Sequence, residues 1–142
     1  MTDEISFTEE EMQELKKAFF DEAYEILQSL GKEMENLEAE REQEDALKKI
    51  QRFYHTIKGN ARAMGFTNLS TLSLNAEALL KAIQETPRDV DQDLRELMSA
   101  INDSLLQYLD GHHSGSEVQL DEGLVGRIEA YRDPSGGSAT KT

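Results

Sequence analysis

Apolar side chains recur every three or four positions along most of the chain, which is the spacing of one face of an α-helix. Patterns typical of strands are missing. We expect the first helix from Thr8 to about Ala39, with Thr8 and Glu11 forming a capping box. Its apolar stripe is expected to contain Met12, Leu15, Phe19, Ala23, Ile26, Leu30, Met34 and Leu37. Gly31 costs the helix interior about 1 kcal/mol but leaves the stripe intact.

The same spacing predicts two more long helices in the middle of the chain. The second begins near Asp45 and ends around Gly65, since glycine readily takes the left-handed conformation that ends a helix. The third starts at Thr67 or Asn68, both good N-caps, and ends before Pro87.

Two further helices are expected in the C-terminal part. Asp89 or Asp91 can cap a fourth helix that ends at Asp110–Gly111. A shorter fifth helix is suggested by Leu120, Leu124, Val125, Ile128 and Tyr131.

Four long amphipathic helices joined by short loops predict an all-α fold, namely an antiparallel four-helix bundle with an additional C-terminal fifth helix. We expect this bundle to span residues 1–133. Residues 134–142 contain a Pro-Ser-Gly-Gly-Ser run and are expected to form a flexible linker. Such a linker suggests a module of a longer protein, although a frayed natural tail would have the same composition.

One histidine of the second helix is expected to face outward. The apolar positions of that helix fall within an arc of roughly 100°, and they are Ala46, Leu47, Ile50, Phe53, Tyr54, Ile57, Ala61 and Met64. His55 lies about 140° from the centre of that arc. On its side of the helix stand Lys48, Arg52, Lys58, Gly59 and Arg62. An exposed imidazole among cations is suited to carrying an anion.

The distribution of charge points to the same region. The chain has 15 Lys and Arg against 29 Asp and Glu, and its net charge of -14 argues against nucleic-acid binding. Between Ala46 and Ala76, however, there is no acidic residue, although five basic residues occur there. The segment from Ala46 to Ala76, called the acid-free window below, therefore has no carboxylate side chain although the whole chain is acidic.

Composition excludes several other classes. There is no cysteine, which excludes disulfides and cysteine-based zinc sites. No apolar run approaches the roughly 20 residues of a transmembrane helix, and the first residues are acidic where a signal peptide would be basic. We expect a soluble cytoplasmic protein.

The segment His55–Phe66, read as H-T-I-K-G-N-A-R-A-M-G-F, resembles the signature of histidine-phosphotransfer (HPt) domains. It is most similar to the N-terminal module of CheA-type chemotaxis histidine kinases. The matching positions are His55, Ile57, Lys58, Gly59, Ala61, Gly65 and Phe66. The similarity extends to Phe19–Ala23 and Glu77–Leu80, and covers roughly residues 8 to 110.

The resemblance implies a phosphoryl carrier. His55 matches the histidine that accepts a phosphoryl group of ATP from a histidine kinase catalytic domain and donates it to an aspartate of a response-regulator receiver domain. Lys58 matches the lysine beside the phosphohistidine, Glu77 the glutamate that hydrogen-bonds the ring, and Gly59 the glycine that leaves room for the incoming domain. The resemblance further implies that the chain binds no cofactor, because the kinase domain uses Mg-ATP and the receiver domain holds Mg²⁺, and that the isolated module is a monomer.

Chemistry gives a separate reason for each residue type. Neutral imidazole is nucleophilic at physiological pH because its ordinary pKa is about 6.5. A carboxylate such as Glu77 can fix the ring tautomer and leave Nε2 free to attack phosphorus. A lysine such as Lys58 offsets the phosphoryl charge of about -1.5 to -2. Because no phosphate cradle or magnesium site is visible, we expect a carrier rather than a complete catalyst.

Two positions depart from the family pattern. Leu74 stands where these modules commonly have a second histidine, and it is expected to face outward near Glu77. It is either an ordinary exposed leucine or a docking contact for the receiver or kinase domain. Arg62 replaces a small residue and is expected to tune partner choice. The expected partner-binding residues are Arg52, Lys58, Gly59, Arg62 and Leu74.

Two alternative functions remain open. One is a free-standing phosphorelay protein that shuttles phosphoryl groups between receiver domains. The other is a helical adaptor that is never phosphorylated and whose basic face binds an acidic partner.

Two possible metal-binding segments have a simpler interpretation. Asp89–Asp93 begins like a calcium loop, but Leu94 and Ala100 stand where that loop needs Gly and Glu. These acids are better explained as helix caps. His112 and His113 have no further ligands nearby in sequence and are expected to be solvent-exposed loop residues.

Overall fold

The computed structural model describes residues 7–86 and 89–133. These residues form five α-helices and no strand, which confirms the all-α prediction. The helices are α1 (Glu9–Glu38), α2 (Gln43–Met64), α3 (Thr67–Glu85), α4 (Gln92–His113) and α5 (Glu122–Arg132). The expected linker at 134–142 and Pro87 lie outside the described residues.

Most helix ends follow the local signals in the sequence. Thr8 and Glu11 form the expected capping box, in which each backbone N–H donates to the other side chain at 2.9 and 3.0 Å. Asp91 is the cap of α4, because its carboxylate accepts from the Leu94 amide at 2.9 Å. Gly65 ends α2 with a φ of 77°, the left-handed conformation expected there.

The start of α3 is where the capping prediction is wrong. Phe66 is the N-cap and makes no side-chain capping bond, while Thr67 and Asn68 are already helical. Asn68 is buried, and its amide nitrogen donates to the Val118 carbonyl in the α4–α5 connection at 2.7 Å. The side-chain oxygen of Asn68, which is the atom that would cap a helix, accepts instead from Nε2 of His112 at 2.7 Å. Helix α2 also starts two residues earlier than Asp45.

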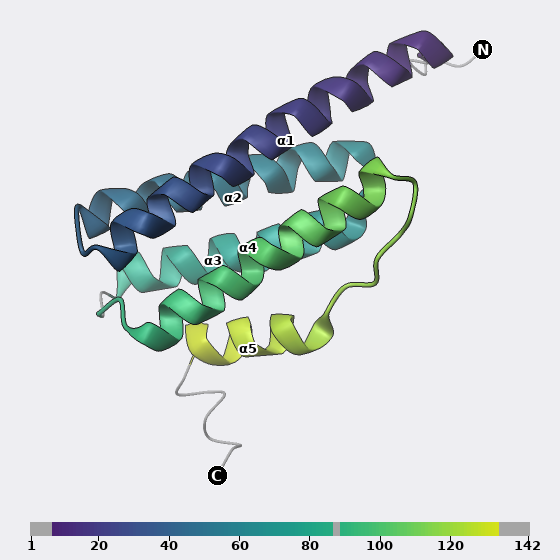
Figure 1. Ribbon diagram of the computed structural model, residues 1–142. Coiled ribbons are helices and arrows are strands. Elements are labelled where there is room, and N and C mark those ends of the chain that lie inside the picture. Colours follow the sequence, from purple (N-terminus) through teal and green to yellow (C-terminus); the bar gives the residue numbers. More distant parts are fainter. Residues whose placement is uncertain (1–6, 87–88, 134–142) are drawn as a thin grey trace.

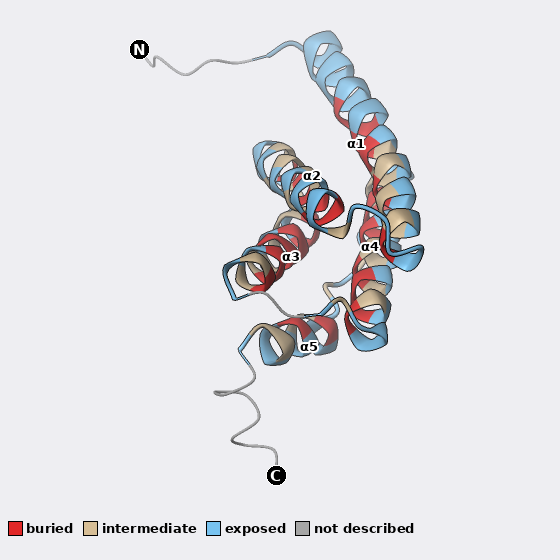
Figure 2. Ribbon diagram, turned by 90° about the vertical axis from the view of Figure 1, so that its left-hand side faces the viewer, coloured by how far each residue is buried: buried red, intermediate tan, exposed pale blue. Residues whose placement is uncertain are grey.

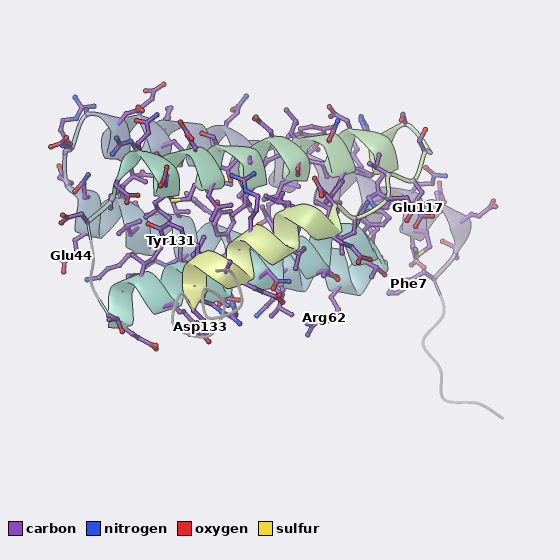
Figure 3. The ribbon with its side chains drawn as sticks, turned by 90° about the horizontal axis from the view of Figure 1, so that it is seen from below. Phe7, Glu44, Arg62, Glu117, Tyr131 and Asp133 are labelled. Carbon is purple, nitrogen blue, oxygen red and sulfur yellow. The ribbon has the colours of Figure 1, made fainter. Side chains whose placement is uncertain are left out.

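The first four helices pack as a ring. Helix α1 contacts α2 and α4, and α3 contacts the same two helices from the other side (Figure 1). Their buried faces point toward one another around one hydrophobic core (Figure 2). Helix α5 packs on α3 and α4, and the hydroxyl of Tyr131, labelled in Figure 3, donates to the Asp91 carboxylate at 3.2 Å. The ring leaves the outer face of α2, and the part of α3 that α5 does not cover, open to solvent.

The predicted apolar stripe of α1 is wrong at its beginning. Met12 and Leu15 are exposed, because the 30-residue α1 extends beyond α2 and α4, which have 22 residues each (Figures 1 and 2). Burial begins at Phe19 and includes Phe20, which lies outside the predicted stripe. The ring of Phe20 lies 4.7 Å from that of His113, so the end of α4 covers it.

The two adjacent histidines also differ from the sequence interpretation. They form the last turn of α4 rather than a loop. His112 is half-buried, because its ring stacks on Phe66 at 3.9 Å and its Nε2 donates to Asn68 Oδ1 at 2.7 Å. His113 is exposed, as expected.

Candidate functional site

His55 projects outward from α2, as the helical spacing predicted. Its neighbours Tyr54 and Ile57 are buried, whereas 65% of the His55 side chain is exposed. Two contacts hold the helix in this rotation. The Tyr54 hydroxyl donates to Asn102 of α4 at 2.7 Å, and the amide of Asn60 donates to Glu22 of α1 at 3.0 Å.

Glu77 of α3 lies behind the histidine and is almost fully buried. Only 5% of its side chain is exposed. Its Oε2 lies 2.9 Å from Nδ1 of His55, and its Oε1 accepts a hydrogen bond from Nζ of Lys58 at 2.7 Å. Each carboxylate oxygen thus has its own donor from α2, which is what a buried charge requires.

The charge state of Glu77 determines the tautomer of His55. Burial by itself raises the pKa of Glu77, but the hydrogen bonds and positive charge of Lys58 and His55 outweigh it and leave the pKa below its usual value. Glu77 is therefore ionised at neutral pH and can only accept hydrogen bonds. Nδ1 of His55 must donate, so the lone pair of the neutral ring is on the exposed Nε2.

Lys58 is turned toward the protein rather than toward solvent. Only 18% of its side chain is exposed, and its amine is committed to Glu77. The structure thus brings together the three residues of the expected catalytic set, His55, Lys58 and Glu77. It also shows that Lys58 contacts the histidine's partner instead of standing free beside the ring.

The expected partner-binding residues all lie at or near the surface on α2 and α3. Gly59 faces open space, because a Cβ built there meets nothing within 4 Å. Arg52 is exposed, and so is Leu74, one turn before Glu77. Arg62 points away from the helices in Figure 3 and stands two turns after His55, about 10 Å along the axis.

The sequence interpretation missed one cation of the site. A shallow depression beside the histidine is lined by Lys48, Gln51, Arg52, His55, Glu77 and Lys81. Lys81 lies outside the acid-free window, and its Nζ is 3.6 Å from Glu77 Oε2. The signal that could have found it is the four-residue spacing from Glu77, which places both on one side of a helix. Lys49, by contrast, pairs with Asp45 and Glu33 away from the site.

Among the described residues, no group of three or more histidine, aspartate or glutamate side chains is arranged to hold a metal ion. Within 7–86 and 89–133, no helix is both long and apolar enough to cross a membrane.

Comparison with known proteins adds a family and a fold. The family described as Hpt domain matches residues 14–111. Chemotaxis protein CheA of Halobacterium salinarum is 32% identical over 92% of the chain, and CheA of Salmonella typhimurium is 30% identical over 71%. The chain spans only 20% and 15% of the lengths of these two relatives.

A solved structure shares the fold. It is the crystal structure of the phosphorylated P1 domain of CheA3 in complex with CheY6 from R. sphaeroides, which is 19% identical in sequence. The TM-score is 0.77, and the match covers 85% of this chain and 97% of the other.

Proposed function

Because the chain belongs to the Hpt domain family, we propose that it is a phosphoryl carrier of two-component chemotaxis signalling. His55 accepts the phosphoryl group of ATP from a histidine kinase catalytic domain and donates it to an aspartate of a response-regulator receiver domain. The observation that carries this proposal is the pairing of an exposed His55 with the buried, ionised Glu77. This pairing leaves Nε2 as the nucleophile.

In the first transfer, the lone pair on Nε2 of His55 forms the N–P bond while the P–O bond to the leaving ADP breaks. The electron pair of that bond departs with ADP. The ring then carries a positive charge, which the Glu77 carboxylate on Nδ1 balances in the way that a buried aspartate stabilises the imidazolium of serine proteases.

In the second transfer, a carboxylate oxygen of the receiver aspartate attacks phosphorus and the N–P bond breaks. Its electron pair returns to Nε2 and restores the neutral ring with Nδ1 still donating to Glu77. The exposure of His55 and the open space over Gly59 support direct access of a second domain to the phosphoryl group.

The magnesium ion of each transfer comes with the partner domain. Glu77 is the only carboxylate among the residues that line the depression, and both of its oxygens already accept hydrogen bonds. A Mg²⁺ ion prefers carboxylate oxygens and phosphates as ligands. The chain therefore supplies the acceptor nitrogen, while the kinase domain supplies Mg-ATP and the charge stabilisation of the reaction.

The scaffold that we infer for this function is an antiparallel four-helix bundle formed by α1 to α4, with α5 packed on α3 and α4. The ring of helix contacts supports it. The relatives named chemotaxis protein CheA favour a module of a larger kinase over a free-standing carrier, since the chain matches a fifth or less of their length.

The test is intact mass spectrometry after incubation with Mg-ATP and a chemotaxis-kinase catalytic core, followed by addition of a receiver domain. We expect the native chain to gain one acid-labile phosphoryl group and lose it to the receiver. His55→Gln should gain none, whereas His113→Gln, which alters an exposed histidine of α4, should behave like the native chain. Equal phosphorylation of His55→Gln would show that another residue is the acceptor, and no phosphorylation of the native chain would favour the adaptor function.

A further inference from the structure

The depression beside His55 contains cations that are not part of the family signature His55–Phe66. Three of the residues that line it are cations from two helices, Lys48 and Arg52 of α2 and Lys81 of α3. No ion pair of Lys48 or Arg52 is found in the part of the chain that the structure describes. The charge of these cations is therefore available to an anion that enters the depression.

Lys58 is less available to such an anion, because its amine already donates to the buried Glu77 carboxylate. Its amine lies 2.7 Å from Glu77 Oε1, and moving it to a phosphoryl group on Nε2 of His55 would leave half of a buried carboxylate without a donor. Removing one partner of a buried ion pair is strongly destabilising. The contact between Lys58 and Glu77 therefore favours other, less constrained cations as the residues that stabilise a phosphoryl group on His55.

Lys81 and Arg52 have the reach and the freedom to supply it. Lys81 Nζ is 3.6 Å from Glu77 Oε2, the same oxygen that contacts His55 Nδ1, so this amine is already next to the ring. Its side chain is 54% exposed and its contact with Glu77 is loose, so its flexible stem can turn toward Nε2. Arg52 stands three residues before His55 on the same side of α2 and carries a fork of donors that matches phosphate oxygens.

We propose that Lys81 and Arg52 are the phosphoryl-binding residues of this site, whereas Lys58 is a positioning residue that acts through Glu77. This inference rests on the proposed phosphorylation of His55. Two cations, one on each side of the depression, match the charge of about -1.5 to -2 on a protein phosphoryl group. Lys81 and Arg52 neutralise the phosphoryl group on His55 until the receiver domain binds.

The ionisation of the phosphoryl group itself tests this assignment. Nearby cations favour its dianionic form and lower its pKa, which is measured by ³¹P NMR titration of the phosphorylated chain. We expect Lys81→Met and Arg52→Met each to raise this pKa by roughly half a unit, as expected for an exposed ion pair, and the double variant to raise it further. Lys81→Arg should preserve the native value.

Two further variants test whether the change in the phosphoryl pKa depends on where the removed cation lies. Lys49→Met removes a cation of the same helix that pairs with Asp45 at 3.3 Å and does not line the depression, so it should leave the pKa unchanged. Lys58→Met should shift it less than Lys81→Met. A shift at Lys58 larger than at Lys81 and Arg52, or no shift at either of these two, would overturn the assignment while leaving the carrier function intact. If the native chain takes up no phosphoryl group, the proposed function itself fails.

Discussion

Nδ1 of His55 and Oε2 of Glu77 lie 2.9 Å apart, although the histidine is on α2 and mostly exposed while the glutamate is on α3 and almost fully buried. This contact pairs an exposed imidazole with a carboxylate that is almost fully buried. It orients the ring and selects its tautomer, and under the proposed function it also balances the positive charge of a ring whose Nε2 has bonded to phosphorus. The predictions below follow from this contact and from the surface around it.

Replacing Glu77 by glutamine should slow phosphorylation of His55 about 10- to 100-fold, which is the effect of losing the carboxylate that orients a metal-bound imidazole. The amide can donate to Nδ1 as well as accept from it, so the reactive tautomer is no longer selected. The initial rate of phosphoryl incorporation from Mg-ATP and a kinase core measures this. Glu85→Gln, an exposed change near the end of α3, should keep the native rate; equal rates for both variants would contradict the orienting role.

The same contact makes stability depend on pH. Burial opposes ionisation of Glu77, but the bonds from Lys58 and His55 hold the pKa of Glu77 below the usual value of 4.5. Because this pKa is depressed in the folded state, the ionised carboxylate contributes stability above pH 4.5. That contribution is lost as the pH falls through the lower folded value.

Urea unfolding of the native chain and of Glu77→Gln over a range of pH measures this linkage. The free energy of unfolding of the native chain should decrease more steeply below pH 4.5 than that of the variant. Parallel curves for the two proteins would show that Glu77 is not the group responsible.

Gly59 should prove costly for stability and necessary for transfer. A Cβ at this helical position meets nothing within 4 Å, so Gly59→Ala should raise the free energy of unfolding by roughly 0.5–1 kcal/mol. Gly31→Ala should do the same in α1, because its surroundings are equally open. The larger change Gly59→Leu should slow transfer to the receiver domain, since it fills the surface one turn from His55.

Stopped-flow or quench measurements of transfer separate access from stability. Gly31→Leu serves as the control, because it places the same side chain on an open helix surface away from the site. The access argument fails if both leucine variants transfer at the native rate.

Leu74→Ala should weaken binding to the receiver domain more than it weakens the fold. The residue is 46% exposed, one turn before Glu77, so its truncation removes little buried surface. Leu106 of α4 is 42% exposed and supplies a matched control, since Leu106→Ala removes the same atoms far from the site in sequence. Titration against the receiver and denaturant unfolding of both variants measure the two effects; unchanged affinity of Leu74→Ala would mean that it is an ordinary surface leucine.

Part of the site could be predicted from the spacing of residues along single helices, and part of it could not. Helical spacing predicted that His55 faces outward, and the acid-free window lies on the same helix, whereas Glu77 was assigned from the family resemblance. The sequence did not show that Lys58 donates to Glu77, and Lys81, which lines the depression together with Lys48 and Arg52, was overlooked. The direction of a side chain and its contacts with another helix depend on tertiary packing, which the spacing of residues along one helix does not predict.

The amino-acid sequence by itself determined the five helices, the capping box at Thr8, the left-handed stop at Gly65 and the outward histidine, because each depends on neighbours within a few turns. Only the tertiary structure decided that Met12 and Leu15 remain exposed and that His112 is half-buried, because these outcomes depend on where another helix ends or begins. The charge of Glu77 and the tautomer of His55 belong to the same class. They exist because α2 brings two groups, His55 and Lys58, within hydrogen-bonding distance of one buried carboxylate on α3.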